Sequence, residues 1–181
     1  QGRLIFGVGT GWTRGEFEAA GEDFDNRGKR TEEIVEILKK LWTEETIEFD
    51  GEFYSFDPVK FEPKPLQQPH PPVHFGGEAP VALRRAACLG DGWIGLPKSI
   101  EETRASIRYM LEQRAEVGKA KDDFEITVYC GLPQTLDSVR RYEELGVHRV
   151  GLLVGSETGD GGPDTVMLQL ENWANDIVTK V

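Results

Sequence analysis

The 181-residue sequence has only two cysteines, Cys88 and Cys130, only three histidines and no long apolar run. The cysteines lie far apart and show neither a CxxC motif nor a Cys/His ligand spacing, which argues against a zinc site or a disulfide framework. No apolar stretch approaches the ~18 residues of a membrane span, and the first residues look like neither a signal nor a transit peptide. We therefore expect a cytoplasmic protein that does not associate with membranes.

Basic residues are also scarce: 21 Lys and Arg stand against 32 Asp and Glu, for a formal charge of -11. Such a surface repels phosphate backbones and anionic lipid headgroups, which disfavours nucleic acid as a partner. Any anionic ligand must be held by a local arrangement of donors. The length is enough for one substantial core and too short for two ordinary ones, so we predict a single domain over residues 1–181.

The histidines His70, His74 and His148 show no spacing that suggests a metal site or a catalytic triad, so we expect them to be core or surface residues. Arg84 and Arg85 are expected on a solvated helix face. Lys98 directly follows a strand-like segment and is the better candidate for pairing with a phosphate.

Strand-like and helix-like segments alternate along the chain. Apolar runs predict strands at 4–8, 73–77, 93–96, 124–129 and 150–154. Three- and four-residue apolar spacing predicts helices from about Asn26, from Pro80 to Gly90, after the Ser99 capping box, before Gly146 and after an Asp164 cap. Five strands, each followed by a helix, indicate a parallel α/β fold, either an open doubly wound sheet or part of an eight-stranded barrel.

One segment interrupts this alternation. Asp50-Gly51 between two strand-like runs predicts a tight hairpin turn with positive φ angles. The following residues, 58–72, carry six prolines and should form an extended, irregular connection within the domain.

Two glycine clusters follow predicted strands, Gly7-Val-Gly-Thr-Gly-Trp12 and Gly76-Gly77-Glu78. The first superficially suggests a dinucleotide fingerprint, but its third glycine comes one residue early and no acidic residue ends a second strand at the required distance. Glycines allow either a turn or a close approach of backbone to a ligand. Both readings stay open, although the carboxyl ends of parallel strands are where α/β proteins build their sites.

An ordered set of motifs resembles the bacterial luciferase-like monooxygenase family, in particular its branch that uses the deazaflavin coenzyme F-420. The motifs are Gly2-Arg3, Gly7–Trp12, Phe17-Glu-Ala-Ala-Gly21, Arg27-x-x-Arg30-x-x-Glu33, Leu41-Trp42, Phe49-x-Gly-x-Phe-Tyr54, Pro63-Lys-Pro65, Pro69–Val73, Gly76-Gly77 and Gly90-Asp-Gly-Trp93. This resemblance implies a (βα)8 TIM-barrel fold, incomplete here, with about five βα units and an inserted β-hairpin.

The resemblance also implies a cofactor, FMN or coenzyme F-420, lying across the carboxyl ends of the strands. Carried over by position, the cofactor-binding residues are Gly9, Thr10, Gly11, Trp12, Gly76, Gly77, Glu78 and Lys98. One branch of the family has an acidic proton donor where this chain has Trp12, so the sugar-phosphate substrate of that branch is disfavoured. No catalytic residue is assigned, because the family's catalytic histidine precedes the segments matched here.

We therefore expect an oxidoreductase or monooxygenase that acts on a small organic substrate in its full-length form. The alternative is a non-catalytic half-barrel that binds a phosphate ligand or a partner chain. The chain is expected to be the C-terminal part of a barrel. In isolation it should have open sheet edges and lack enzymatic activity. A homo-oligomer is also expected.

Overall fold

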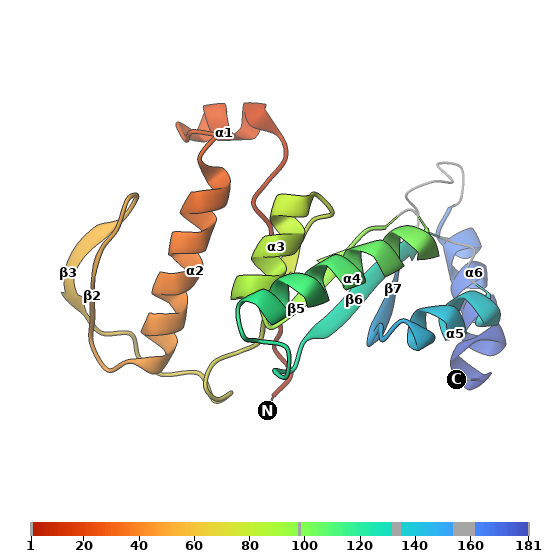
Figure 1. Ribbon diagram of the computed structural model, residues 1–181. Helices are drawn as coiled ribbons and strands as arrows, with labels where there is room; N and C mark the ends of the chain where they lie inside the picture. The colour runs from red at the N-terminus through yellow and green to blue at the C-terminus, as the bar shows by residue number, and fades with distance from the viewer. Residues whose placement is uncertain (1, 98, 132–134, 154–161, 181) are drawn as a thin grey trace. The chain divides into compact units, whose positions relative to one another are not determined.

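The computed structural model describes residues 2–97, 99–131, 135–153 and 162–180, and they form an α/β fold (Figure 1). The strands of the larger sheet follow the order β1-β4-β5-β6-β7, with a separate two-stranded sheet of β2 and β3. The chain divides into two compact units, residues 1–74 and 75–181, and β4 (Val73–Gly76) crosses the division. The alternation of strands and helices predicted from the sequence is confirmed; the single-domain organisation stays a prediction.

The first unit contains β1 (Phe6–Val8), α1 (Arg14–Ala20), α2 (Arg27–Thr43), β2 (Ile47–Asp50) and β3 (Ser55–Val59). The expected strand 4–8 is shorter and less buried than its apolar sequence indicates, since Leu4 is exposed and Phe6 and Val8 are half-buried. The short helix α1 was not expected, because its Arg-Gly-Glu-Phe-Glu-Ala-Ala sequence has too few turns to show an apolar period.

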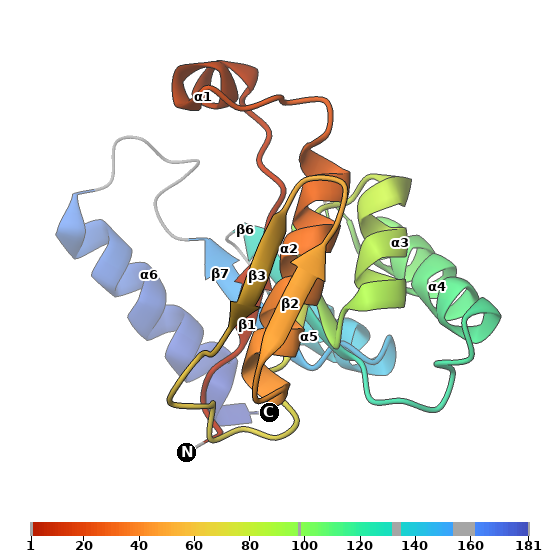
Figure 2. The ribbon, with the colours of Figure 1, turned by 90° about the vertical axis from the view of Figure 1, so that its left-hand side faces the viewer.

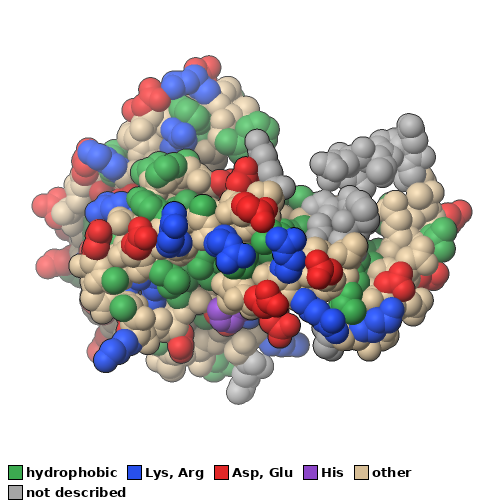
Figure 3. Space-filling view, turned by 45° about the vertical axis from the view of Figure 1, so that its right-hand side comes forward, with side chains coloured by type: hydrophobic (Ala, Val, Ile, Leu, Met, Phe, Trp, Pro, Cys, Tyr) green, Lys and Arg blue, Asp and Glu red, His purple; other side chains and the backbone are tan. Residues whose placement is uncertain are grey.

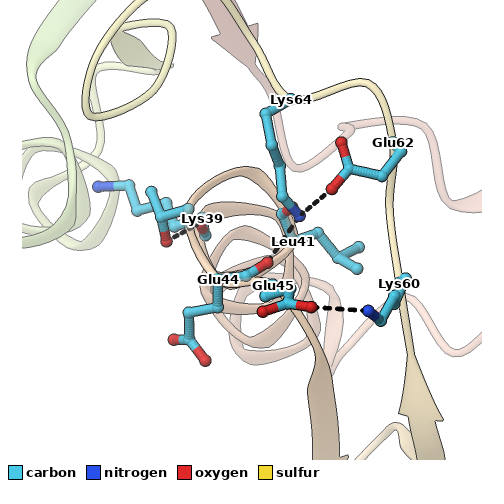
Figure 4. Close-up of polar contacts among 8 residues, drawn as sticks. Lys39, Leu41, Glu44, Glu45, Lys60, Glu62 and Lys64 are labelled. Carbon is cyan, nitrogen blue, oxygen red and sulfur yellow. Dashed lines mark hydrogen bonds and ion pairs between the residues drawn. The ribbon is translucent and has the colours of Figure 1, made fainter.

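The proline-rich connection is tied to the carboxyl end of α2 (Figure 4). The Lys64 ammonium group donates to the carbonyl oxygens of Leu41 and Glu44 at 2.9 and 2.6 Å. The last carbonyls of a helix lack intrahelical donors and carry partial negative charge. A lysine there supplies both hydrogen-bond donors and a compensating positive charge. An ion pair between Lys60 and Glu45 at 2.7 Å also holds this connection to the segment that follows α2.

The hairpin lies alongside α2 (Figure 2), and its loop differs from the predicted turn. Asp50 pairs with Ser55, so four residues rather than two join the strands, and Gly51 does not have the positive φ that was expected. The cause is Glu33 on α2, whose carboxylate accepts hydrogen bonds from the amides of Glu52, Phe53 and Tyr54 at 2.6–3.2 Å. A carboxylate that receives several backbone donors holds a wider loop than the hairpin sequence alone would adopt.

Replacing Glu33 by Gln should therefore loosen the hairpin. An amide keeps one acceptor but loses the charge that strengthens three hydrogen bonds, and we expect the free energy of unfolding to fall by about 1–2 kcal/mol. Amide hydrogen exchange at residues 52–54 should speed up. The matched control is Glu36→Gln, which removes only an exposed pair with Lys40 and should change stability by about 0.5 kcal/mol or less. Equal effects of the two variants would contradict this role of Glu33.

The second unit contains α3 (Pro80–Leu89), β5 (Gly92–Gly95), α4 (Ile100–Glu116), β6 (Glu125–Gly131), α5 (Leu136–Glu144), β7 (Arg149–Leu153), α6 (Pro163–Asp176) and a 3₁₀ turn (Val178–Lys180). Strands β5, β6 and β7 are parallel, with Trp93 beside Ile126 and Cys130 beside Leu152. Helices α3 and α4 lie in front of β5 and β6 (Figure 1). No helix in the described stretches is both long and apolar enough to cross a bilayer.

The helix boundaries in this unit confirm most of the predicted signals. Pro80 begins α3, and the Ser99 hydroxyl accepts from the Glu102 amide at 3.1 Å at the start of α4. Asp164 is not the cap of α6: Gly162 holds that position, Pro163 begins the helix and Asp164 lies in its first turn. Arg85 is also not on the solvated face, because only Arg84 is exposed and Arg85 belongs to the buried side of α3.

Two cationic side chains donate hydrogen bonds to carbonyl oxygens at the carboxyl end of α3. The buried guanidinium of Arg114 donates to the carbonyl oxygens of Ala87 and Asp122 at 3.3 and 2.9 Å, and it lies over the Phe124 ring. Lys119 donates to the carbonyl oxygen of Cys88 at 2.7 Å. Burial lowers the pKa of Arg114 from its ordinary value, but the guanidinium remains charged in its hydrogen bonds. These contacts fix α3 against α4 and the turn before β6.

The core of the second unit also holds a phenol. Tyr142 on α5 is buried, and burial together with a hydrogen bond to Cys130 raises the pKa of Tyr142 to about 12. Burial likewise raises the pKa of the Cys130 thiol. Both groups are therefore held in their neutral forms.

Stability should accordingly decline at high pH. The unfolded chain releases the Tyr142 proton near pH 10, about two units before the folded protein does. The contribution is fully present below the unfolded pKa and is lost as the pH rises toward the folded one. The difference in unfolding free energy between wild type and Tyr142→Phe should therefore shift by about 2 kcal/mol between pH ~9.5 and ~12. Urea denaturation across this range measures it, and parallel pH curves for the two proteins would contradict it.

Candidate functional site

The loop after β1 presents four of the predicted cofactor-binding residues. Among the described residues, no atom lies within 4 Å of the position a Cβ on Gly9 would occupy, so its backbone is open on that side. Thr10 is half-buried, and Gly11 has a φ of +81°, a left-handed conformation that favours glycine. The Trp12 side chain is 88% exposed. This loop therefore offers bare backbone followed by a flat aromatic surface.

A cluster of aromatic and basic side chains holds this loop in place. A Cβ on Gly11 would lie 2.6 Å from the Phe17 ring, which packs edge-on against Phe24. The Arg27 guanidinium lies 3.7 Å from the Phe24 ring centroid and donates through Nε to the Gly11 carbonyl oxygen at 3.2 Å. Sequence reasoning missed this role, because it quoted Arg27 within a family motif but assigned it no function. The signal lay in its place among the quoted motifs.

Gly76 ends β4, the loop after it begins with Gly77 and Glu78, and residues at the end of β5 fix this loop. The indole Nε1 of Trp93 donates to the Gly77 carbonyl oxygen at 2.9 Å. The amide of Leu96 donates to the Glu78 carboxylate at 2.7 Å. The structure thus brings Gly76, Gly77 and Glu78 together with the residues that follow β5. Trp93 and Leu96 were not predicted as site residues.

Close packing explains the glycines around Trp93, which is fully buried. The Trp93 ring lies directly against Gly95, where a Cβ would collide with it. Gly77 has a φ of +110°, and a Cβ there would come within 2.9 Å of the Ala82 Cβ on α3. These glycines are required by the framework of the loop itself.

Lys98, the predicted phosphate ligand, lies outside the described residues. Of the histidines, His74 is buried in β4, and His148 accepts through Nδ1 from the Ile126 amide at 3.1 Å. Within the described ranges no three His, Cys, Asp or Glu side chains are grouped so as to hold a metal ion. At the two loops, the carbonyl oxygens of Gly11 and Gly77 accept from Arg27 and Trp93, and the Glu78 carboxylate accepts from the Leu96 amide.

These features define the class of the fold: parallel βα units with glycine-rich loops at the carboxyl ends of their strands. Residues 1–133 match the luciferase-like monooxygenase family, and the chain belongs to that family. The predicted resemblance is confirmed.

Known relatives agree with this membership. An uncharacterized protein of Mycobacterium tuberculosis is 38% identical over 99% of the chain, and an FMNH(2)-dependent dimethylsulfone monooxygenase of Pseudomonas putida is 36% identical over 66% of it. The matched segments cover 62% and 34% of those proteins, so the chain spans less than two thirds of either relative.

Solved structures confirm the fold class. An F-420-dependent secondary alcohol dehydrogenase, solved with an F-420-acetone adduct, superimposes with a TM-score of 0.78 at 17% identity, over 98% of this chain and 69% of the dehydrogenase chain. The chain thus has the fold of part of a TIM barrel, as predicted.

The geometry at Gly77 predicts that Gly77→Ala destabilises the second unit. The new Cβ meets Ala82 and the φ of +110° is strained for alanine, so we expect a loss of about 2–3 kcal/mol in unfolding free energy. Gly118→Ala is the control, since Gly118 has a φ of +78° with nothing within 4 Å and should lose only about 1 kcal/mol. Thermal and urea unfolding compare them, and a smaller loss at Gly77 than at Gly118 would refute the packing argument.

Proposed function

We propose that the full-length protein is a flavin- or deazaflavin-dependent oxidoreductase that acts on a small organic substrate. The observation that supports this most is the pair of glycine-rich loops at the carboxyl ends of β1 and β4, in a chain that belongs to the luciferase-like monooxygenase family. In parallel βα folds, ligands bind at this end of the strands. The cytoplasm stays the proposed location.

The residues present fit a planar cofactor. The open backbone at Gly9 allows close approach, and the exposed Trp12 indole offers a surface for stacking against a ring. In a strongly acidic chain, carboxylates near the site would repel a cofactor phosphate. The Glu78 carboxylate already accepts a hydrogen bond from the Leu96 amide. We therefore assign Glu78 to positioning the loop, and propose Lys98 as the phosphate partner on the resemblance alone.

The cofactor, when bound, supplies hydride transfer or oxygen activation, and this chain supplies binding and orientation. In this proposal, Arg27 holds the first loop by donating a hydrogen bond to the Gly11 carbonyl oxygen. Trp93 holds the second loop by donating to the Gly77 carbonyl oxygen. Each loop is thus fixed through a backbone carbonyl by a side chain from a neighbouring element. Preorganised loops of this kind bind a ligand with less ordering cost.

The named relatives leave two cofactors to be tested, since one carries FMNH(2) in its name and another was solved with F-420. We propose to purify the full-length protein, identify any released ligand by mass spectrometry and titrate the protein with FMN and with F-420. We expect saturable binding of one of them. Binding of neither would favour the alternative, a non-catalytic half-barrel that binds another phosphate ligand or a partner chain.

Gly9→Val tests whether the first loop contacts the cofactor. The added side chain enters open space and should leave stability nearly unchanged, while it blocks approach and raises the cofactor dissociation constant by about tenfold or more. Gly15→Val is the matched control, because Gly15 on α1 also has nothing within 4 Å. Titration followed by fluorescence compares them, and equal affinities would remove Gly9 from the proposed site.

A further inference from the structure

The parallel sheet of the second unit has two unlike faces. On one face of β6, Val128 and Cys130 are buried, and Cys130 is hydrogen-bonded to Tyr142 of α5. Successive side chains of a strand point to opposite faces, so Thr127 and Tyr129 lie on the face turned away from α5. In a βα barrel the helices surround the strands, which makes this second face the inner face of the sheet.

The inner face changes in character from the start of the strands to their end. Near the start, Arg149 of β7 and Glu125 of β6 form an ion pair at 2.7 Å. Beyond this pair, the register of β5, β6 and β7 places uncharged residues on the face: Ile94, Thr127, Tyr129, Gly151 and Leu153. The outer surface differs, since Figure 3 shows Lys, Arg, Asp and Glu side chains among the apolar ones. The hydroxyls of Thr127 and Tyr129 are thus polar groups on an otherwise apolar part of the inner face.

The ring of Tyr129 packs against a glycine of the neighbouring strand. Tyr129 pairs with Gly151 in the register of β6 and β7, and a Cβ on Gly151 would lie 2.5 to 3.2 Å from atoms of the Tyr129 ring. The ring therefore lies directly against the backbone of β7, in space that a glycine leaves free. Phenylalanine would fill this space equally well. Packing thus explains the ring of Tyr129 but not its hydroxyl.

The hydroxyl of Tyr129 lacks the kind of partner that the other buried phenol has. Among the described residues, nothing forms a hydrogen bond with it, and the side chain is 38% exposed, whereas Tyr142 is bonded to Cys130. A closed barrel buries its inner face, and a buried hydroxyl without a partner is costly. The partner of Tyr129 must therefore come from a ligand or from a part of the full-length protein outside the described residues.

The height of Tyr129 on the sheet favours a ligand. Val128 pairs with Gly95, the last residue of β5, so Tyr129 lies level with Leu96. The Leu96 amide donates to the carboxylate of Glu78, in the loop of Gly77. Tyr129 therefore lies at the carboxyl end of the strands, level with the residue that fixes one of the two loops assigned to the cofactor.

We propose that the hydroxyl of Tyr129 is a cofactor-binding group, which donates a hydrogen bond to an oxygen of the bound cofactor. This inference rests on the proposed function. FMN and F-420 both carry carbonyl oxygens on their ring systems, so one phenol can serve either cofactor. A phenol is also an uncharged donor, so it adds no negative charge near the cofactor phosphate.

Tyr129→Phe in the full-length protein tests the inference, because it removes the hydroxyl and keeps the ring against Gly151. Titration with FMN and with F-420 should show the dissociation constant of the bound cofactor raised about five- to tenfold, as for the loss of one hydrogen bond. The unfolding midpoint of the cofactor-free protein should stay unchanged, as expected for a hydroxyl whose partner is the ligand. Tyr142→Phe is the matched control, since it removes a phenol from the other face and should leave the affinity unchanged.

Fluorine NMR separates direct contact from an indirect effect. With fluorotyrosine incorporated into the full-length protein, the signal that is missing from Tyr129→Phe should shift when FMN or F-420 is added, and the Tyr142 signal should not. A loss of affinity without this shift would overturn the inference.

Two further outcomes separate this inference from the proposed function. If wild type binds a cofactor and Tyr129→Phe binds it equally well, only the inference is overturned, and a lowered unfolding midpoint would then assign the hydroxyl to a partner elsewhere in the protein. If wild type binds neither FMN nor F-420, the proposed function is overturned together with the inference.

Discussion

Burial of the Trp93 indole is the constraint on which the second unit's loops depend. The ring occupies space that only a glycine at 95 leaves free, and its Nε1 cannot be buried without an acceptor. The Gly77 carbonyl provides that acceptor. With that carbonyl held, the chain turns through a positive φ at Gly77 and brings Glu78 to the Leu96 amide. One aromatic residue in a strand thus determines the conformation of two loops.

The first unit also fixes a loop through a hydrogen bond to a backbone carbonyl, but with a different kind of side chain. Its loop carbonyl, on Gly11, is held by a guanidinium stacked on Phe24, where the second unit uses an indole inside the core. Stacking on an aromatic face suits arginine, because its planar group keeps its donors in the ring plane and stays charged. In a chain with 32 acidic residues, arginines on aromatic faces also supply local positive charge near a loop expected to meet an anionic cofactor. Glycine motifs therefore specify a shape only together with the side chains that hold their carbonyls.

Much of the fold could be predicted from the sequence, because helix periodicity, Pro80, Ser99 and buried apolar strands are local signals. What failed depended on distant partners. The Asp50-Gly51 hairpin turn was wrong since Glu33, nearly twenty residues earlier, receives the loop amides, and Arg85 was misplaced since packing of α3 decides which face is buried. For the site, position along the chain predicted the loops, while the hydrogen bonds from Arg27 and Trp93 to the loop carbonyls could be found only from the structure.

The glycines in and beside the two loops consequently differ in why they lack a side chain. Gly11, Gly77 and Gly95 lie against other atoms of their own unit, so their lack of a Cβ serves the packing of the protein. No atom of the described residues lies close to where a Gly9 side chain would begin, so a side chain there would cost the fold little. Gly15 has equally open surroundings, so open space alone does not indicate a ligand, and what distinguishes Gly9 is its place directly after the carboxyl end of β1. Within the Gly7–Trp12 motif, the argument for a ligand therefore depends on Gly9, and the argument for a turn depends on Gly11.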